Sequence, residues 1–253
     1  MIDHLSPSQI KMYMRCPRQW EFRYVKGIKI PPSGAMVLGS AYHEGLEERF
    51  RYVIDNKGQP DSQLAIDTFD TSFERIRSEH IVKEDEDEIP FDEIVWEEDP
   101  GKLKDMGIKL IKIYENNIAP RITPIAVEEK HVISIMGIPL HIIIDLEQEK
   151  RIADHKVKSR VFSPDDLAQD IQATAYWMDT GKPMDFHIAL KTKQPRIEIQ
   201  STTRESWHAT WFCDQVLSVW KAIKTGIFPP KDQGWHCSER WCGYWNLCKG
   251  GYK

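Results

Sequence analysis

Residues 142–160 read IIIDLEQEKRIADHKVKSR, and this stretch decides the fold predicted for the chain. Three isoleucines lead directly into Asp145, which predicts a buried strand ending at that residue, and residues 147–149 have the composition of a turn. A second strand carries Asp154 and Lys156, whose side chains point to one face because side chains alternate along a strand. A charge directly after a buried run needs a partner. Since the strand ends of a hairpin come close, we expect Asp145 to meet Asp154 and Lys156.

Two converging carboxylates can share one divalent cation. Hard cations such as Mg²⁺ prefer oxygen ligands and usually bind one or two carboxylates. Lys156 would stand beside the cation, where an ammonium orients a water or stabilises charge developing on a phosphate. The ring of His155 is predicted to point away, although its backbone carbonyl could reach the ion. The alternative is a surface hairpin with ordinary salt bridges, because Asp-x-Lys tripeptides are common.

The sequence on both sides of the hairpin predicts an α/β fold. Ser6, Pro7 and Gln9 have the residue types of a helix start with a capping box. Helices are expected over 6–16, 18–25, 39–54, 61–79, 101–117, 163–181 and 204–225, and strands within 125–159 and over 185–193 and 196–203. This order favours a mixed sheet flanked by helices. We predict a single domain over 1–253, with an N-terminal helical part (1–60), a central sheet (120–200) and a C-terminal cysteine segment (226–253).

Composition limits the class of protein. The chain has 253 residues, of which 41% are hydrophobic, enough for one large domain. The N-terminal residues lack the apolar core of a secretory signal. No window approaches the roughly 18 apolar residues that cross a bilayer. We therefore expect a soluble, cytoplasmic protein that has no membrane partner.

The net charge of −5 is unevenly distributed. Residues 79–99 hold eleven acidic residues and one basic residue, Lys83; without them, 28 acidic and 33 basic residues remain, a net charge of +5. An acidic segment on a basic body does not exclude a polyanionic partner. We interpret 84–88 as a solvated loop or helix end, and the sequence assigns no function to the acidic residues of 84–99.

Three of the five cysteines lie within the last 17 residues, at Cys237, Cys242 and Cys248. Disulfides are unusual in a cytosolic protein, so this clustering indicates a metal or a cluster. Cys16 is the candidate fourth ligand, and it would join the two ends of the chain. A purely thiolate set fits either Zn²⁺ or a [4Fe–4S] cluster. We expect neither His236 nor Cys213 to be a ligand, and unrelated free thiols are the alternative.

In their order along the chain, these motifs resemble the PD-(D/E)xK nucleases with a restriction-endonuclease-like core. The core motif is IIID, eight residues, then DHK. The RecB-like branch adds a histidine on an early helix, matched by GSAYHEGLE with His43, and a Gln-x-x-x-Tyr helix, matched by QATAY with Gln172 and Tyr176. Its iron–sulfur members carry one N-terminal and three C-terminal cysteines, as in MRCPRQWEF and CSERWCGYWNLC. Four residues, rather than the more usual two, separate the first two C-terminal cysteines.

The resemblance implies a role for each matched residue. The catalytic Mg²⁺ or Mn²⁺ would be bound by His43, Asp145, Asp154 and the carbonyl of His155. Lys156 would position the attacking water, and Gln172 and Tyr176 would hold the DNA strand near the scissile phosphate. The preference for a [4Fe–4S] cluster over Zn²⁺ at Cys16, Cys237, Cys242 and Cys248 also comes from the resemblance. Taken singly, His43 fits a core or surface histidine, and Gln172 with Tyr176 fits a packing pair.

The resemblance implies a metal-dependent exonuclease that hydrolyses single-stranded DNA, with the 5′→3′ polarity found in the iron–sulfur branch. Basic residues expected to contact phosphates are Lys150, Lys158, Arg160, Lys191 and Lys193. The resemblance places the enzyme in recombination and repair, phage DNA metabolism or CRISPR adaptation, in a bacterial, archaeal or phage-infected cell, with protein partners from those pathways. No GxxxxGK[ST] motif is present, which argues against a fused helicase motor. The alternatives are a non-catalytic DNA-binding adaptor of the same fold and a zinc-stapled structural protein.

Overall fold

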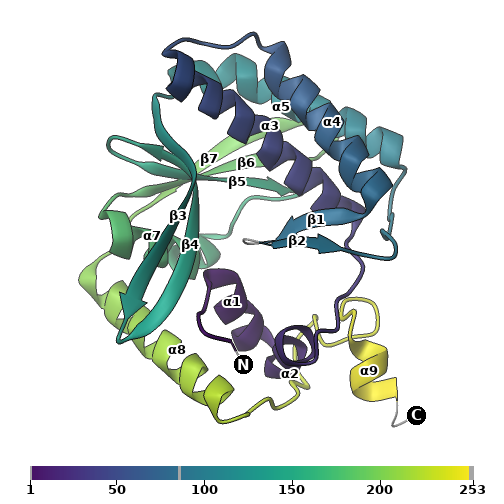
Figure 1. Cartoon of the computed structure of the whole chain (residues 1–253), viewed down its shortest axis with the longest axis vertical. Coiled ribbons are helices and arrows are strands. Elements are labelled where there is room, and N and C mark those ends of the chain that lie inside the picture. The colour runs from purple at the N-terminus through teal and green to yellow at the C-terminus, as the bar shows by residue number, and fades with distance from the viewer. Residues whose placement is uncertain (1, 85–86, 251–253) are drawn as a thin grey trace. The chain divides into compact units, whose positions relative to one another are not determined.

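A computed structural model describes residues 2–84 and 87–250, apart from the side chains of 83, 84 and 87–89. The helices are α1 (Pro7–Arg15), α2 (Pro17–Trp20), α3 (Gly34–Asn56), α4 (Gln63–Glu79), α5 (Pro100–Asn117), α6 (Pro164–Ala168), α7 (Ile171–Thr180), α8 (Ser206–Lys224) and α9 (Trp245–Lys249) (Figure 1). The strands are β1 (Ile81–Glu84), β2 (Asp87–Pro90), β3 (Pro124–Ile135), β4 (Ile138–Gln148), β5 (Ile152–Lys158), β6 (Met184–Leu190) and β7 (Arg196–Thr202). Short π and 3₁₀ turns cover Glu21–Val25 and Ala119–Arg121.

The chain divides into two compact units. One contains the N-terminal 30 residues, Val132–Ile142 and the chain from Glu205 onward, and the other contains Pro31–His131 and Ile143–Arg204. The candidate catalytic residues all lie in the second unit, and the four cysteines of the predicted cluster all lie in the first. The single nuclease domain expected over 1–253 stays a prediction.

The five-stranded sheet has the order β3-β4-β5-β6-β7. The pairings of β4 with β5 and of β6 with β7 are antiparallel, whereas β5 and β6 run parallel. All seven residues of β6 are buried, as expected for a strand covered on both faces. The predicted mixed sheet flanked by helices is therefore confirmed.

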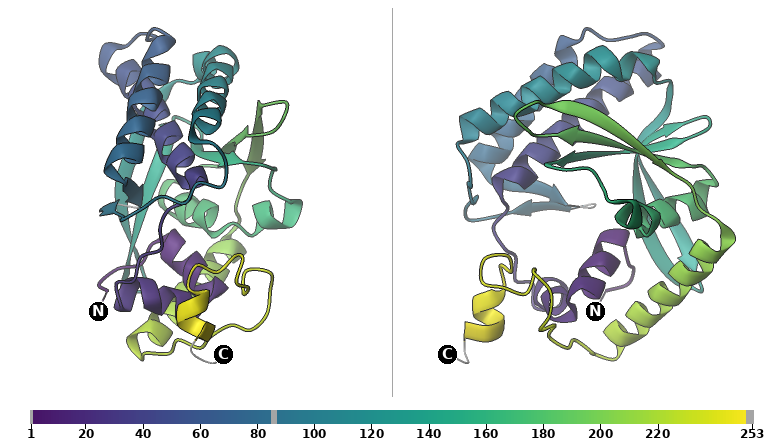
Figure 2. Two further views of the ribbon diagram at one scale, coloured as in Figure 1. Left: turned by 90° about the vertical axis from the view of Figure 1, so that its right-hand side faces the viewer. Right: turned by 180° about the vertical axis from the view of Figure 1, so that it is seen from behind.

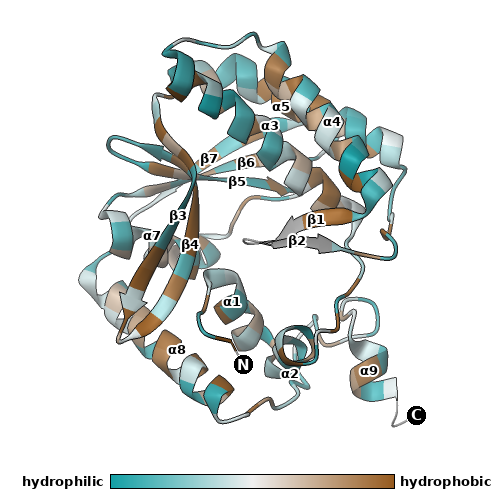
Figure 3. Ribbon diagram, in the orientation of Figure 1, coloured by the Kyte–Doolittle hydropathy of each residue, from teal (hydrophilic) through white to brown (hydrophobic). Residues whose placement is uncertain are grey.

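Helices α3, α4 and α5 pack together in the second unit, with polar and apolar bands along them (Figures 2 and 3). Ser33 caps α3 by accepting a hydrogen bond from the Met36 amide at 3.3 Å, so the helix begins at Gly34, five residues before the predicted start. Side chains of α3, α4 and α5 form one buried core, to which the sheet residues Leu146, Ala153 and Ala189 also belong. This core fixes the helix that carries His43 against β5.

In the first unit, aromatic residues hold the N-terminal helices against the segment after α8. The rings of Trp20 and Phe228 stack with centroids 5.6 Å apart, and the Tyr13 hydroxyl donates to the Ile227 carbonyl at 2.6 Å. Ser6 caps α1 as predicted, accepting from the Gln9 amide at 3.3 Å.

The prediction of a single helix over 163–181 is wrong, because this segment forms two helices, α6 and α7. Asp170 caps α7 by accepting from the Ala173 amide at 3.0 Å, so a new helix begins there. The buried Arg204 guanidinium donates to the carbonyls of Leu167 at 3.2 Å and Asp170 at 2.8 Å. The break therefore has its free carbonyls satisfied inside the protein.

Three smaller predictions are also corrected. Asp145 does not end its strand, since β4 continues to Gln148 and the turn follows. Strand β6 ends at Leu190, so Lys191 and Lys193 lie after it. Part of the segment interpreted as loop or helix end is an antiparallel pair, β1 with β2, in which the buried Val82 joins the helical core; residues 85–86 lie outside the described residues. Within the described ranges, no helix combines the length and apolarity needed to cross a membrane.

Candidate active site

Strand β5 holds Asp154 in the interior. Its side chain is 0% exposed, and Oδ2 lies 2.5 Å from the Lys156 ammonium. The other carboxylate oxygen accepts a hydrogen bond from Gln172 Nε2 on α7 at 2.6 Å. The His155 ring instead stacks parallel to Phe50 of α3, 6.1 Å between centroids. Alternation along the strand thus separates the charged pair from the imidazole between them.

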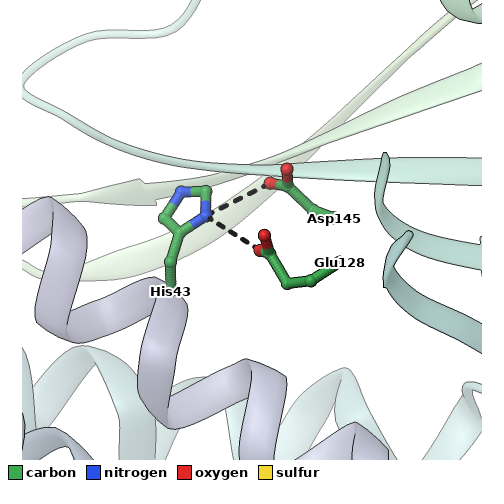
Figure 4. A group of neighbouring side chains, drawn as sticks. All are labelled: His43, Glu128 and Asp145. Atoms are coloured by element: carbon green, nitrogen blue, oxygen red, sulfur yellow. Dashed lines mark ion pairs between the residues drawn. The ribbon is translucent and has the colours of Figure 1, made fainter. Parts of the chain in front are cut away.

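Asp145 and His43 meet beside β5 (Figure 4). The pairing of β4 with β5 joins Leu146 to Ala153, and Asp145 and Asp154 are the next residues along the two strands. Asp145 Oδ2 accepts from the His155 amide at 2.8 Å and lies 3.3 Å from His43 Nδ1. The second ring nitrogen of His43 is 2.7 Å from the His155 carbonyl oxygen.

Sequence analysis did not identify Glu128, which completes this group. Its carboxylate oxygen lies 3.9 Å from His43 Nδ1, and Figure 4 shows the side chain pointing at the histidine. The ligand atoms of His43, Glu128 and Asp145 all lie within 4.8 Å of one another. The adjacent Glu128–Glu129 pair in a predicted strand was the available signal, since alternation sends one of two such carboxylates inward.

Buried charges perturb the pKa values of the group. Burial, and then the charge of Asp154, raises the pKa of Asp145 to about 7. Burial opposes protonation of His43, but the carboxylates of Asp145 and Glu128 outweigh it and raise its pKa to about 9. Burial likewise opposes the charge on Lys156, and Asp154 and Asp145 outweigh it, so the pKa of Lys156 is raised. Lys156 is therefore a charged ammonium at neutral pH.

Gln172 and Tyr176 lie one turn apart on α7, as the motif predicts. Gln172 Nε2 also donates to the Tyr176 hydroxyl at 2.7 Å, and that hydroxyl donates to the Ile143 carbonyl. Tyr176 is 3% exposed. Both donors of the glutamine amide are thus used inside the protein, one of them on Asp154. Their contact with DNA stays a prediction.

A second group of potential ligands lies further along the same strands. The ligand atoms of Glu129, His131 and Glu147 also fall within 4.8 Å of one another. His131 Nδ1 is 2.7 Å from Asp179 on α7, and the Lys182 ammonium is 2.6 Å from Glu147. These contacts connect the two strands to α7 and to Lys182 just after it, which gives the group a structural role.

The four cysteines of the predicted cluster line one cavity, together with residues that include Gln19, Tyr244 and Trp245. Gln19 Nε2 lies 3.1 Å from Cys242 Sγ, and Cys237 Sγ lies 2.8 Å from the Lys231 carbonyl oxygen. All four thiols are free. Burial, and then the neighbouring Cys16 and Cys242, raises the pKa of Cys248. Among the described residues, no three of these sulfurs come within 4.8 Å of one another. His236 also lines the cavity, whereas Cys213 is not among the lining residues.

The predicted phosphate-binding residues differ in their surroundings. Lys150, Arg160 and Lys193 are exposed. The Lys158 ammonium lies over the Phe162 ring, 3.7 Å from its centroid, and Lys191 forms an ion pair with Glu98 at 2.8 Å. Contacts between these residues and DNA stay predictions.

Comparison with known proteins gives the family and the fold of the chain. The crystal structure of a protein named "Putative exonuclease", from Eubacterium rectale, is similar with a TM-score of 0.58 and 13% identity, covering 94% of this chain and 87% of that one. At this identity the similarity shows the fold alone. No curated protein matches the sequence significantly. A family model described as the PD-(D/E)XK nuclease superfamily matches residues 4–249, which include Asp145, Asp154 and Lys156. The chain therefore belongs to the PD-(D/E)XK nuclease superfamily.

Proposed function

We propose that this protein is a metal-dependent exonuclease that hydrolyses single-stranded DNA, with 5′→3′ polarity. The observation that supports it most directly is the meeting of two buried carboxylates, Asp145 and Asp154, with the Lys156 ammonium on adjacent strands. A non-catalytic adaptor would not need this arrangement. A role in recombination and repair, phage DNA metabolism or CRISPR adaptation is part of the proposal.

The residues present fit a divalent cation. An imidazole and two or three carboxylates supply the nitrogen and oxygen donors that Mg²⁺ and Mn²⁺ accept. Burial and then the charge of Asp154 raise the pKa of Asp145, and a bound cation would offset that charge. His43, Asp145, Asp154 and the His155 carbonyl would hold the cation. A bound cation supplies Lewis-acid charge and lowers the pKa of a bound water.

The charge of Lys156 determines what it can do. A protonated ammonium cannot act as a general base, so Lys156 would orient the attacking water and stabilise charge on the scissile phosphate. Gln172 would fix the rotamer of Asp154 through its 2.6 Å hydrogen bond. Arg204 supports this arrangement, because its contacts with Leu167 and Asp170 set the start of α7.

We further propose that Cys16, Cys237, Cys242 and Cys248 bind a [4Fe–4S] cluster, with Zn²⁺ as the alternative occupant. The cavity that all four side chains line supports this role, since its donor set is purely thiolate. The Gln19 amide beside Cys242 supplies the kind of N–H donor that tunes a thiolate-bound iron cluster. Iron content of protein purified without oxygen tests this part. We expect iron in wild type, much less in Cys242→Ser and wild-type amounts in Cys213→Ser; zinc in place of iron contradicts the cluster.

The nuclease assay uses single strands labelled at the 5′ or 3′ end, with a blocked-end control, in Mg²⁺ or Mn²⁺. Wild type should release labelled mononucleotides or short products from the 5′ end first. Lys156→Ala should degrade the strand at least about 100-fold more slowly than wild type. Lys112→Ala, which alters an exposed lysine on α5, should degrade it at the wild-type rate. Cleavage of blocked strands would show an endonuclease, and equal activity of wild type and Lys156→Ala would overturn the mechanism.

A further inference from the structure

Glu128 has an unusual backbone conformation for a residue inside a strand. Its φ is 50°, in the left-handed region where Cβ approaches a carbonyl oxygen too closely. The other described non-glycine residues with positive φ stand at ordinary chain reversals: Lys57 and His80 end α3 and α4, and Met136 lies in the turn between β3 and β4. Glutamate is not a residue that favours this region, so the conformation needs another reason.

The left-handed conformation changes where the side chain points. In a regular strand, neighbouring side chains point to opposite faces. Here Val127 packs against the helical core, and the next residue, Glu128, also reaches a helix, with its carboxylate 3.9 Å from His43 on α3. The side chain of Glu128 is 14% exposed. The fold thus accepts a disfavoured backbone conformation and places a further negative charge beside Asp145.

We propose that Glu128 is an additional ligand of the divalent cation, bound together with His43 and Asp145. Opposite ligands of one Mg²⁺ lie about 4.2 Å apart, twice the roughly 2.1 Å bond. The three ligand atoms already lie within 4.8 Å of one another, so only a small closure is needed. This assignment rests on the metal-dependent function proposed above and adds a residue to its site.

Substitution by asparagine and by glutamine separates the charge from the backbone conformation. Asparagine tolerates the left-handed region better than glutamate does, whereas glutamine keeps the length and removes only the charge. Mn²⁺ affinity is measured by isothermal titration and by the EPR signal of free Mn²⁺. Glu128→Gln and Glu128→Asn should each weaken Mn²⁺ binding by about tenfold or more. Glu48→Gln, which alters an exposed carboxylate on α3, should bind like wild type.

Thermal unfolding without metal provides a second readout. Glu128→Asn should unfold at a higher temperature than wild type, because asparagine adopts the left-handed conformation at lower cost and the variant lacks a negative charge next to Asp145. A purely structural role for Glu128 predicts the opposite shift. The two readouts together therefore show whether the conformation serves the metal or the fold.

The outcomes distinguish this assignment from the proposed function. If Glu128→Gln binds Mn²⁺ as wild type does while Asp145→Asn does not, Glu128 is not a ligand and the nuclease proposal stands. If wild type shows no saturable Mn²⁺ binding, both the assignment and the metal-dependent function are overturned. Weakened binding by both Glu128 variants, with Glu48→Gln unchanged, supports the assignment.

Discussion

Replacing His155 by phenylalanine should stabilise the protein and leave catalysis intact. The His155 ring is 3% exposed, and neither ring nitrogen has a hydrogen-bond partner among the described residues. Its surroundings are aromatic: Phe50 stacks parallel to it, and Tyr114 meets it edge-on with centroids 5.4 Å apart. Its hydrogen bonds to the active site come from the backbone, through the amide bonded to Asp145 and the carbonyl bonded to His43, while its ring meets the His43 ring edge-on with centroids 6.0 Å apart. The ring therefore serves as an aromatic packing residue.

The size of the effect follows from those two nitrogens. A buried polar atom without a partner costs about 1–3 kcal/mol, and the larger phenylalanine ring costs roughly 1–3 kcal/mol in overpacking. Two such nitrogens cost about 2–6 kcal/mol, so the central value of the net gain for His155→Phe is about 2 kcal/mol in the free energy of unfolding. For a chain of this length each kcal/mol corresponds to roughly 2–4 °C in melting temperature. His155→Ala, which deletes the ring, should lose about 3 kcal/mol.

The stability difference between His155→Phe and wild type should depend on pH. Burial, followed by the charges of His187, His43 and Lys156, lowers the pKa of His155 well below its ordinary value. The unfolded chain takes up a proton below about pH 6.5 and the folded state does not, so wild type loses stability as pH falls below that value. The advantage of His155→Phe should therefore grow on acidification, by up to about 1.4 kcal/mol per pH unit.

Urea unfolding at pH 7.5 and pH 5.5, together with the single-strand nuclease assay, checks these expectations. A variant that is folded but inactive would mean that the imidazole takes part in the chemistry, which refutes the assignment of a packing role. A variant that is less stable than wild type at both pH values would mean that the nitrogens are satisfied in solution.

Three further predictions concern residues around the site. Arg49→Met should lower the free energy of unfolding in urea by about 3–5 kcal/mol, because the buried Glu115 carboxylate loses the guanidinium that lies 3.0 Å from it. The double variant Arg49→Met with Glu115→Leu should regain most of that loss. Gly45→Ala should lower the melting temperature, since the added Cβ would lie 2.8 Å from the Ala65 carbonyl oxygen. In the same helix, a Cβ at Gly39 would meet nothing within 4 Å, so Gly39→Ala should raise the free energy of unfolding by about 0.5–1 kcal/mol. Equal shifts in the two variants would contradict the packing described. Gln172→Leu should reduce the turnover number by about tenfold or more with an unchanged circular dichroism spectrum, because Asp154 loses its 2.6 Å donor; unchanged turnover would show that this bond has no catalytic role.

Periodicity and capping residues predicted most elements of the fold. The helices over 61–79 and 101–117 match α4 and α5 to within two residues, because their apolar stripes are long. The break between α6 and α7 escaped prediction because it depends on Arg204, more than 30 residues away, whose donors satisfy the carbonyls of Leu167 and Asp170. Tertiary contacts of this kind leave no local pattern.

Some residues of the candidate site could be predicted from the sequence pattern, and others could not. Asp145, Asp154 and Lys156 were identifiable because charged residues follow apolar runs at strand spacing. His43 and Gln172 could be added only through resemblance, since a histidine or glutamine on an amphipathic helix has ordinary explanations. Glu128 could not be selected over Glu129, because a left-handed residue within the strand overrides the alternation on which the choice depends.

The charges around His43 connect the stability of the fold with the cation proposed to bind there. Glu128, Asp145 and Asp154 carry three potential negative charges, and His43 and Lys156 supply two positive charges. Two carboxylates separated by 4.8 Å, the limit within which the ligand atoms of Glu128 and Asp145 lie, repel by about 3.5 kcal/mol at an effective dielectric constant near 20. Burial and then the charge of Asp154 raise the pKa of Asp145 to about 7, and the charge of Glu128 adds to this rise, so protonation offsets the repulsion in the metal-free protein. A divalent cation offsets the same repulsion without a proton, so the residues that destabilise the metal-free protein are those that would bind the metal most strongly.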